Sequence, residues 1–138
     1  YQAISYYRLD PPGTNPDKLL NRIKVFIQAG LPSMFGFTVY SSYSQARQTG
    51  KIPFPVSGEK RVGGHAVIAV GYDDNMQIKN DGADDSTIGA LMIRNSWGTG
   101  WGDNGYGWLP YEYIKRSLAV DWWSILKSEW VDTKQFGL

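Results

Sequence analysis

Runs of hydrophobic residues, some alternating and some continuous, predict about six strands along this chain. Clusters of Gly, Pro, Asn and Asp separate the runs, and these residues favour changes of chain direction. The expected strands are residues 1–9, 32–40, 66–72, 88–95, 106–109 and 118–126. The second strand contains an interior glycine, Gly36, which weakens a strand and often marks the close approach of another group.

One segment has helical rather than strand spacing. Its apolar residues recur three and four positions apart: Leu19, Leu20, Ile23, Phe26 and Ile27. Thr14 or Asn15 can cap this helix, Pro16 suits its first position, and Gly30 suits its end. The apolar face predicts packing in a core rather than a binding function.

The segments between these elements are polar or rich in glycine. The expected connections are loops over 51–64 and 97–107, a polar hairpin over 73–86, a short helix over 41–49 and a helical turn over 110–115. One main helix and about six strands with local connections predict a single α+β domain. Its expected basis is an antiparallel, barrel-like sheet.

Composition narrows the classes of partner. The chain has 138 residues, of which 42% are hydrophobic and 20% charged, so it is long and apolar enough to bury a core. Its net charge of +1 gives no basis for binding nucleic acid or an anionic membrane. The longest apolar stretch, residues 66–72, is far too short to span a bilayer. We therefore expect neither nucleic acid nor membrane as a partner.

The chain contains no cysteine and one histidine, His65. A disulfide, a thiolate metal site and a cysteine nucleophile are therefore excluded for this chain. A metal site built from several histidines is excluded as well, and we expect no bound metal. The sequence begins without Met and without a signal-peptide pattern, from which we expect a piece of a longer polypeptide.

Two further groups of residues have structural interpretations. The first consists of Asp73, Asp74, Asp81, Asp84 and Asp85. Their spacing does not match a calcium-binding loop and predicts a solvated hairpin tip. Trp122 and Trp123 are adjacent on an expected strand, so their side chains should face opposite sides, one of them toward a surface open to a partner.

Three short motifs contain the candidate chemistry. In GGHAV (63–67) a histidine begins an apolar strand after two glycines, and in RNSWG (94–98) an asparagine and a tryptophan follow the next strand. The third motif, residues 98–107, intersperses glycine with polar and aromatic residues. It lacks the Gly-Lys-Ser/Thr of a phosphate loop and the spacing of a dinucleotide fingerprint. Each motif alone is typical of an ordinary structural role.

Taken together, the motifs resemble one known family. GGHAVIAVGYDD followed by IRNSWGTGWGDNGYGWLPYEYI closely resembles the C-terminal half of papain-like cysteine peptidases, of the bacterial or archaeal type. The match covers residues 63–114, with a looser match at 31–34. The resemblance implies that residues 1–138 form the C-terminal, His/Asn-bearing lobe of the papain-like fold. The N-terminal lobe with the nucleophilic Cys and the oxyanion-hole Gln is then absent from this chain.

The resemblance also implies roles for four side chains. His65 matches the general acid/base, and Asn95 matches the residue that orients the imidazole by accepting from its other ring N–H. Trp97 matches an indole that shields this hydrogen bond and lines the primed side of the cleft. Trp101 matches a second aromatic residue stacked nearby. This arrangement suits a charged thiolate–imidazolium pair, because asparagine is a neutral acceptor.

The resemblance also implies that three small residues take part in substrate binding. Gly64 and Ala66 flank His65, where the family contacts the substrate backbone and the pocket for the second residue before the scissile bond. Gly36 falls where a family strand lines the same pocket. We expect the missing side chain to leave room for bulky apolar groups.

The leading hypothesis is therefore a lobe of a cysteine endopeptidase that hydrolyses peptide bonds and is inactive alone. One alternative is a relative with a Cys–His–Asp arrangement, such as a bacteriocin-processing peptidase, which the NSWG string (95–98) disfavours. Another is a non-catalytic pseudo-peptidase or a module that binds peptides or glycans, which the missing Cys favours. The resemblance implies no metal or organic cofactor.

The resemblance implies two partners: a peptide or protein substrate, and the N-terminal Cys-bearing lobe of the same protein. A lobe without its mate exposes apolar surface that favours association. We therefore expect the isolated chain to dimerise, swap an element or retain a cleaved partner chain. We also expect His65 and Asn95 to lie about 2.6–3.2 Å apart.

Overall fold

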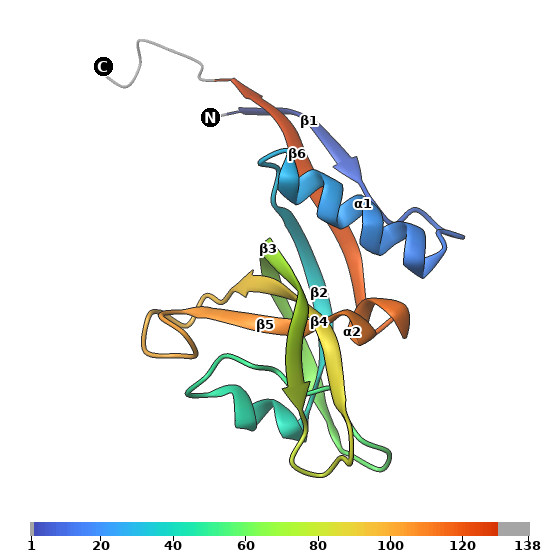
Figure 1. Ribbon diagram of the computed structural model, residues 1–138. Helices are drawn as coiled ribbons and strands as arrows, with labels where there is room; N and C mark the ends of the chain where they lie inside the picture. The colour runs from blue at the N-terminus through green and yellow to red at the C-terminus, as the bar shows by residue number, and fades with distance from the viewer. Residues whose placement is uncertain (1, 130–138) are drawn as a thin grey trace.

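The computed structural model of this chain describes residues 2–129 (Figure 1). Its elements are β1 (Gln2–Arg8), α1 (Pro16–Gln28), β2 (Ser33–Tyr40), the 3₁₀ helix η1 (Ser41–Ala46), β3 (Arg61–Lys79), β4 (Ser86–Arg94), β5 (Tyr106–Pro110), α2 (Tyr111–Lys115) and β6 (Ala119–Glu129). The predicted α+β class is confirmed, with one main helix and a sheet.

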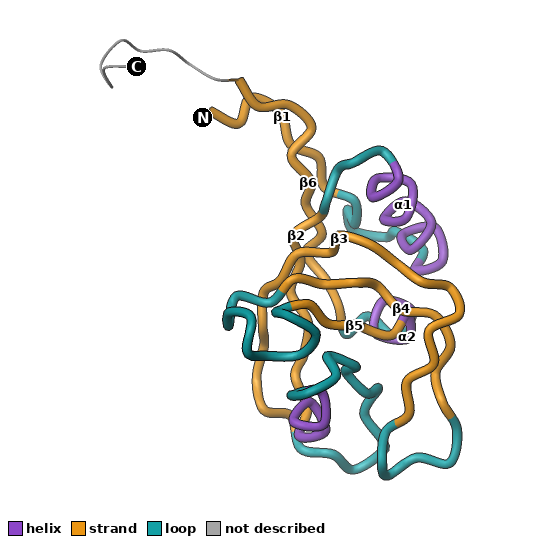
Figure 2. Tube along the Cα trace, turned by 60° about the vertical axis from the view of Figure 1, so that its left-hand side comes forward, coloured by secondary structure: helices purple, strands orange, loops and turns teal. Residues whose placement is uncertain are grey.

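The strands form one antiparallel sheet in the order β1-β6-β2-β3-β4-β5. Strands β1 and β6 make a two-stranded arm, and β2 leads from this arm into the other half of the molecule (Figure 1). There β3, β4 and β5 curl round, as the tube in Figure 2 shows. No pairing joins β5 to β1 within residues 2–129, so the expected barrel-like curvature is present without a closed barrel.

Helix α1 begins and ends at the residues that the sequence predicts. The side-chain oxygen of Asn15 accepts from the backbone N–H of Asp17 at 2.9 Å and of Lys18 at 3.3 Å, which satisfies two of the free N–H groups of the first turn. Gly30, with φ +79°, follows the last turn. In the described part of the chain, no helix has the length and apolarity needed to cross a membrane.

The largest departure from expectation is the length of β3. Hydrophobicity predicts a strand over 66–72 only, whereas β3 has 19 residues. Its polar second half remains in the sheet because its backbone pairs with β4, although register shifts interrupt the alternation of side chains. The predictions of a loop up to residue 64 and of a hairpin starting at 73 are therefore wrong at those ends. The turn covers residues 80–85.

Two of the aspartates assigned to the hairpin tip lie in β3 instead. Asp74 Oδ1 lies 2.8 Å from Lys24 Nζ and accepts a hydrogen bond from the Tyr111 hydroxyl at 2.7 Å. The hydrogen bonds from Lys24 and Tyr111 hold the pKa of Asp74 below its ordinary value. The exposed tip contains only Asp81, Asp84 and Asp85. Asp74 thus connects β3 to both helices rather than to solvent alone.

Asp10 joins the two ends of the described chain. Its carboxylate accepts from the backbone N–H groups of Asp121 and Trp122, each at 2.8 Å. Asp121 has a positive φ of 65°, a left-handed conformation that is uncommon for non-glycine residues. The hydrogen bonds to Asp10 hold the backbone at this point, where β6 passes from the core into the arm.

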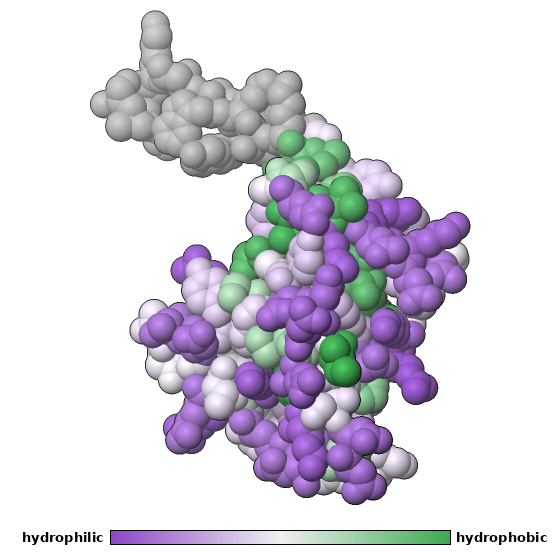
Figure 3. Space-filling view, in the orientation of Figure 1, coloured by the Kyte–Doolittle hydropathy of each residue, from purple (hydrophilic) through white to green (hydrophobic). Residues whose placement is uncertain are grey.

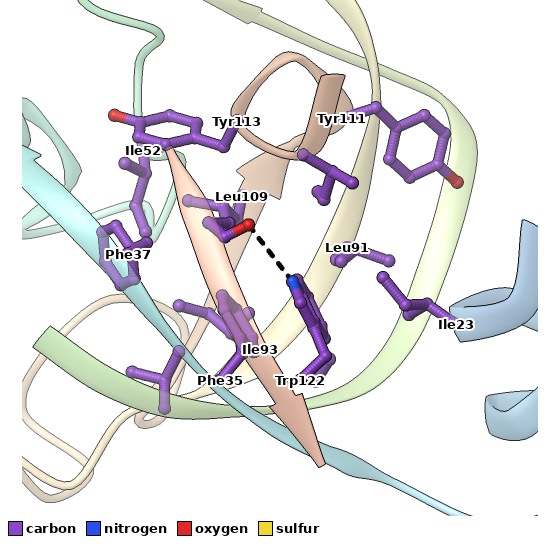
Figure 4. Close-up of a cluster of buried hydrophobic side chains, with 14 of the residues drawn as sticks. Ile23, Phe35, Phe37, Ile52, Leu91, Ile93, Leu109, Tyr111, Tyr113 and Trp122 are labelled. Atoms are coloured by element: carbon purple, nitrogen blue, oxygen red, sulfur yellow. Dashed lines mark hydrogen bonds between the residues drawn. The ribbon is translucent and has the colours of Figure 1, made fainter. Parts of the chain in front are cut away.

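Trp122 is the largest fully buried side chain of the core (Figure 4). Its indole stacks on Phe35 with centroids 3.9 Å apart and planes 8° apart, and its Nε1–H donates to the Ala119 carbonyl at 3.2 Å. The surrounding buried residues include Ile23, Phe37, Ile52, Leu91, Ile93, Leu109, Tyr111 and Tyr113. Trp123 is only partly buried, as strand alternation predicts.

We predict that Trp122→Ala lowers the free energy of unfolding by about 3–5 kcal/mol, because it removes the stacked indole and leaves a cavity. Urea denaturation of the purified chain measures this change. The control Ile88→Ala removes a side chain that is 60% exposed and should change stability by less than about 0.5 kcal/mol. Equal effects of the two substitutions would contradict the assigned core.

Candidate active site

His65 lies in β3 with its ring on the inner side of the curled sheet. In register it faces Phe37 of β2, whose ring meets the imidazole edge-on with centroids 5.9 Å apart. The phenyl ring and the sheet limit the positions that the imidazole can take. The ring nitrogen Nε2 points toward the end of β4, whereas Nδ1 has no hydrogen-bond partner among the described residues.

Asn95 follows the last residue of β4 and is 4% exposed. Its backbone N–H donates to the Gly105 carbonyl at 2.9 Å, which ties it to the glycine-rich loop. Its side-chain Oδ1 lies 2.9 Å from His65 Nε2, within the range expected from the sequence. Because β3 and β4 are adjacent antiparallel strands, the sheet brings together two residues that are 30 apart in sequence.

The second end of the Asn95 amide has its own partner. Nδ2 donates to the hydroxyl of Tyr43, in η1, at 3.0 Å, and both side chains are buried. Burial raises the pKa of Tyr43 to about 12, although the Asn95 hydrogen bond acts in the opposite direction. The hydroxyl is therefore neutral across the physiological range.

Three aromatic rings surround this pair. The indole of Trp97 lies over His65 with centroids 5.0 Å apart, and it is 56% exposed. Trp101 is buried and meets Trp97 edge-on, with planes 88° apart. It stacks on Tyr43 instead, with planes 16° apart. The two indoles are therefore neighbours, and Trp101 is stacked on Tyr43 rather than on Trp97.

The glycine-rich loop is held by close backbone contacts. A Cβ on Gly107 would lie 2.7 Å from the Trp101 ring and 2.9 Å from the Gly50 carbonyl oxygen. Gly102 has φ +62°, and its N–H donates to the Arg47 carbonyl at 2.8 Å. A side chain at Gly107 would push Trp101 away from Tyr43, whereas one at Gly102 would meet the Tyr106 carbonyl oxygen at 2.5 Å in a left-handed backbone conformation.

The residues implied in substrate binding line one pocket. It has a volume of about 460 Å³, and its lining includes Gly36, Gly64, His65, Ala66 and Arg61. In register, Gly36 lies between Ala66 and Val120 of the neighbouring strands. A Cβ on Gly36 would make only an ordinary contact of 3.8 Å, so close backbone approach does not explain this glycine. The glycine instead keeps the floor of the pocket open.

The carboxylate of Glu59 anchors η1, the element that positions Tyr43. It accepts from the backbone N–H of Ser42 at 2.8 Å, from that of Val56 at 2.6 Å and from Asn80 Nδ2 at 2.9 Å. Burial raises the pKa of Glu59, but these hydrogen bonds outweigh burial and hold it below the ordinary value of 4.5. Neither Glu59 nor Tyr43 belongs to the motifs, so sequence reasoning missed both.

Within residues 2–129 there is no group of three or more His, Asp or Glu side chains that could hold a metal ion. The site therefore offers an imidazole, an amide and aromatic surfaces. Such a set can hold and transfer a proton, but it contains no nucleophilic thiol.

Comparison with known proteins agrees with this geometry. The family model described as papain family cysteine protease matches residues 8–118. A peptidase C1-like protein of Acanthamoeba polyphaga mimivirus is 37% identical over 128 residues, which is 90% of this chain. The chain belongs to the papain family of cysteine proteases.

Other papain-family proteins match as well. The crystal structure of xylellain, a cysteine protease from Xylella fastidiosa, covers 94% of this chain with a TM-score of 0.71 and 34% identity. Papain from Carica papaya is 48% identical over 42 residues, which is 30% of this chain and 8% of papain. The bromelain protease from Ananas comosus, at 20% identity and a TM-score of 0.54, shares the fold over 88% of this chain and 50% of its own.

This papain-family chain is short beside its relatives. It covers 37% of the mimivirus protein and 42% of xylellain. It thus spans less than half the length of either, and the activity of a complete papain-family enzyme needs residues that are not in this chain.

We predict that Glu59→Gln destabilises the chain by about 1 kcal/mol at about pH 7, because the ionised carboxylate is the better acceptor for the three N–H groups. A carboxyl whose folded pKa is lowered stabilises the fold above the unfolded pKa, and this contribution disappears as the pH falls through the folded pKa. The difference between wild type and Glu59→Gln, measured by urea denaturation, should therefore shrink below pH 4.5.

Glu112→Gln is the matched control. Its carboxylate has one ion pair, 3.7 Å from Lys115, and should contribute less than about 0.5 kcal/mol at either pH. A Glu59→Gln difference that grows toward acid would contradict the assigned hydrogen bonds.

Proposed function

We propose that this chain is the His/Asn-bearing C-terminal lobe of a papain-like cysteine endopeptidase. The supporting observation is the 2.9 Å contact between His65 Nε2 and Asn95 Oδ1, which leaves Nδ1 without a partner in the described structure. Since the chain contains no cysteine, the nucleophile belongs to an N-terminal lobe of the same protein. The isolated chain is then inactive.

In this proposal the imidazole of His65 exchanges a proton with the thiol through Nδ1. The resulting thiolate attacks the peptide carbonyl, and the imidazolium then donates its Nδ1 proton to the departing amine. Water hydrolyses the acyl-enzyme with the same imidazole as base. Asn95 keeps the second ring nitrogen hydrogen-bonded throughout, because its oxygen accepts from Nε2–H in the neutral and the charged ring.

The surrounding residues have supporting roles in the proposal. Trp97 shields the His65–Asn95 hydrogen bond, lies on the primed side of the cleft, and packs edge-on against Trp101. The pocket over Gly36, Gly64 and Ala66 receives a substrate side chain before the scissile bond. A peptide or protein is the substrate, and no cofactor takes part.

A non-catalytic pseudo-peptidase, or a module that binds peptides or glycans, is the second candidate. It is favoured by the lack of cysteine and by the exposure of Trp97, because exposed aromatic rings bind such ligands. The two candidates differ in what happens when a Cys-bearing lobe is supplied.

We predict that joining this chain to its Cys-bearing lobe gives thiol-dependent hydrolysis of a fluorogenic peptide. In that protein His65→Ala lowers kcat/KM by at least about 1,000-fold. Asn95→Ala has a smaller effect, about 10- to 100-fold, because it removes one hydrogen bond to a charged ring. The exposed Asn75→Ala is the control and should leave the rate unchanged. Full activity in His65→Ala, or peptide binding without hydrolysis, would refute the peptidase proposal.

One face of the sheet next to the site is apolar. On this face Met34 of β2 lies opposite Trp123 of β6 on one side and Ile68 of β3 on the other. Arg94 of β4 lies opposite Ile68 and ends the row. Met34 lines two hollows of about 290 and 380 Å³, and Asn95 lines the first of them. Figure 3 shows hydrophobic side chains gathered over and beside the arm, whereas the opposite end is mostly hydrophilic. We propose that the Cys-bearing lobe covers this face.

We predict that the isolated chain self-associates through this face, because Met34 is 48% and Ile68 37% exposed. Sedimentation velocity should show a dimer or a larger species, which Met34→Glu converts to a monomer. Val25→Glu, at a 60% exposed position of α1, is the control and should not change the association. A monomeric wild-type chain would contradict this proposal.

A further inference from the structure

The hydroxyl of Tyr43, a residue outside the three motifs, lies against the Asn95 amide. It accepts a hydrogen bond from Asn95 Nδ2 at 3.0 Å, on the side of the amide opposite to His65. Tyr43 is 9% exposed and Asn95 4% exposed, so solvent has little access to this contact. The three side chains form one hydrogen-bonded row from the cleft into the core.

The two ends of an asparagine amide have nearly the same shape and opposite hydrogen-bonding character. With its oxygen toward His65, the amide accepts a proton-bearing Nε2. With its nitrogen toward His65, it can only donate to Nε2, and the neutral ring must then carry its proton on Nδ1. The orientation of Asn95 therefore decides whether Nδ1 can accept a proton from another group.

In the first orientation the Tyr43 hydroxyl accepts from Nδ2–H, and in the reversed one it can donate to Oδ1. A phenyl ring at this position would leave a buried N–H without a partner in the first orientation but only a carbonyl oxygen in the reversed one. The orphaned N–H is the costlier of the two, so loss of the hydroxyl penalises the first orientation more. The reversed amide is compatible with Tyr43 only while the ring is neutral and protonated on Nδ1. An imidazolium has N–H on both ring nitrogens and excludes the reversed amide.

We propose that Tyr43 is a positioning residue for His65: its hydroxyl holds the Asn95 amide with the oxygen toward Nε2, so that Nδ1 stays open to the cleft. The orientation of the Asn95 amide and the position of the proton on the His65 ring concern this chain alone and do not depend on a Cys-bearing lobe. Its consequence for catalysis depends on the proposed peptidase function.

The surroundings of Tyr43 suit such a role. Its ring is stacked on Trp101 and contacts Trp97 edge-on, with centroids 5.8 and 5.7 Å away. The Glu59 carboxylate holds η1 through the Ser42 N–H group. The hydroxyl is neutral because burial raises its pKa to about 12. A fixed, uncharged oxygen is thus presented to the amide.

The test uses the isolated chain, in which His65 is the one histidine, so every imidazole NMR signal belongs to it. The ring ¹⁵N shifts of the neutral imidazole report which nitrogen carries the proton. In wild type we expect the Nε2–H form. In Tyr43→Phe, which keeps the ring but removes the hydroxyl, we expect the ratio of the Nδ1–H to the Nε2–H form to rise about fivefold.

Tyr111→Phe is the matched control, because it removes a partly buried hydroxyl that contacts Asp74 and not the site. It should leave the ratio of the two ring forms unchanged. Equal ratios in Tyr43→Phe and wild type would overturn the proposal. If Tyr43→Phe does not fold, the wild-type chain provides the test through nuclear Overhauser effects (NOEs). NOEs between the Asn95 side-chain amide protons and the Tyr43 ring protons support the proposal, and their absence overturns it.

A second arm measures catalysis in the protein that carries the Cys-bearing lobe. Tyr43→Phe should lower kcat about fivefold with KM unchanged, and shift the alkaline limb of the pH–rate profile to lower pH. A changed ring-proton ratio in a protein without peptidase activity would reject the proposed function but keep the positioning role. An unchanged ratio in an active protein would reject the positioning role alone.

Discussion

The buried amide of Asn95 is the constraint on which the site depends. A buried amide must be hydrogen-bonded at both ends, because the loss of water is otherwise not compensated. The oxygen is paired with His65 and the nitrogen with Tyr43. These two contacts connect η1 to the paired strands β3 and β4. The polar pair thereby fixes where the surrounding apolar residues must pack.

The aromatic and glycine residues follow from this requirement. Trp97 and Trp101 cover the pair from outside and from the core side, and both contact Tyr43. Trp101 reaches Tyr43 only because Gly107 has no side chain in its path. In the GTGWGDNGYG string Gly107 gives the indole its clearance, whereas Gly102 and Gly105 allow left-handed turns with close backbone contacts.

Sequence reasoning predicted the parts of the molecule that depend on local signals. Asn15 and Gly30 mark the ends of α1, and the spacing of His65 and Asn95 placed them on neighbouring strands. It failed where contacts between distant segments decide the structure. The polar half of β3 is a strand because β4 pairs with it, and the exposed Asp74 pairs with Lys24 and Tyr111 of the two helices. No local pattern marked Tyr43, because its partner is 52 residues away.

The Asp10 carboxylate has a consequence for how the fold assembles. The His65–Asn95 contact closes a segment of 30 residues, whereas the hydrogen bond from the Trp122 N–H to Asp10 closes one of 112. Loop-closure entropy grows only with the logarithm of length, so the longer closure costs about 1 kcal/mol more. The β3–β4 hairpin should then form early and the β1–β6 arm late.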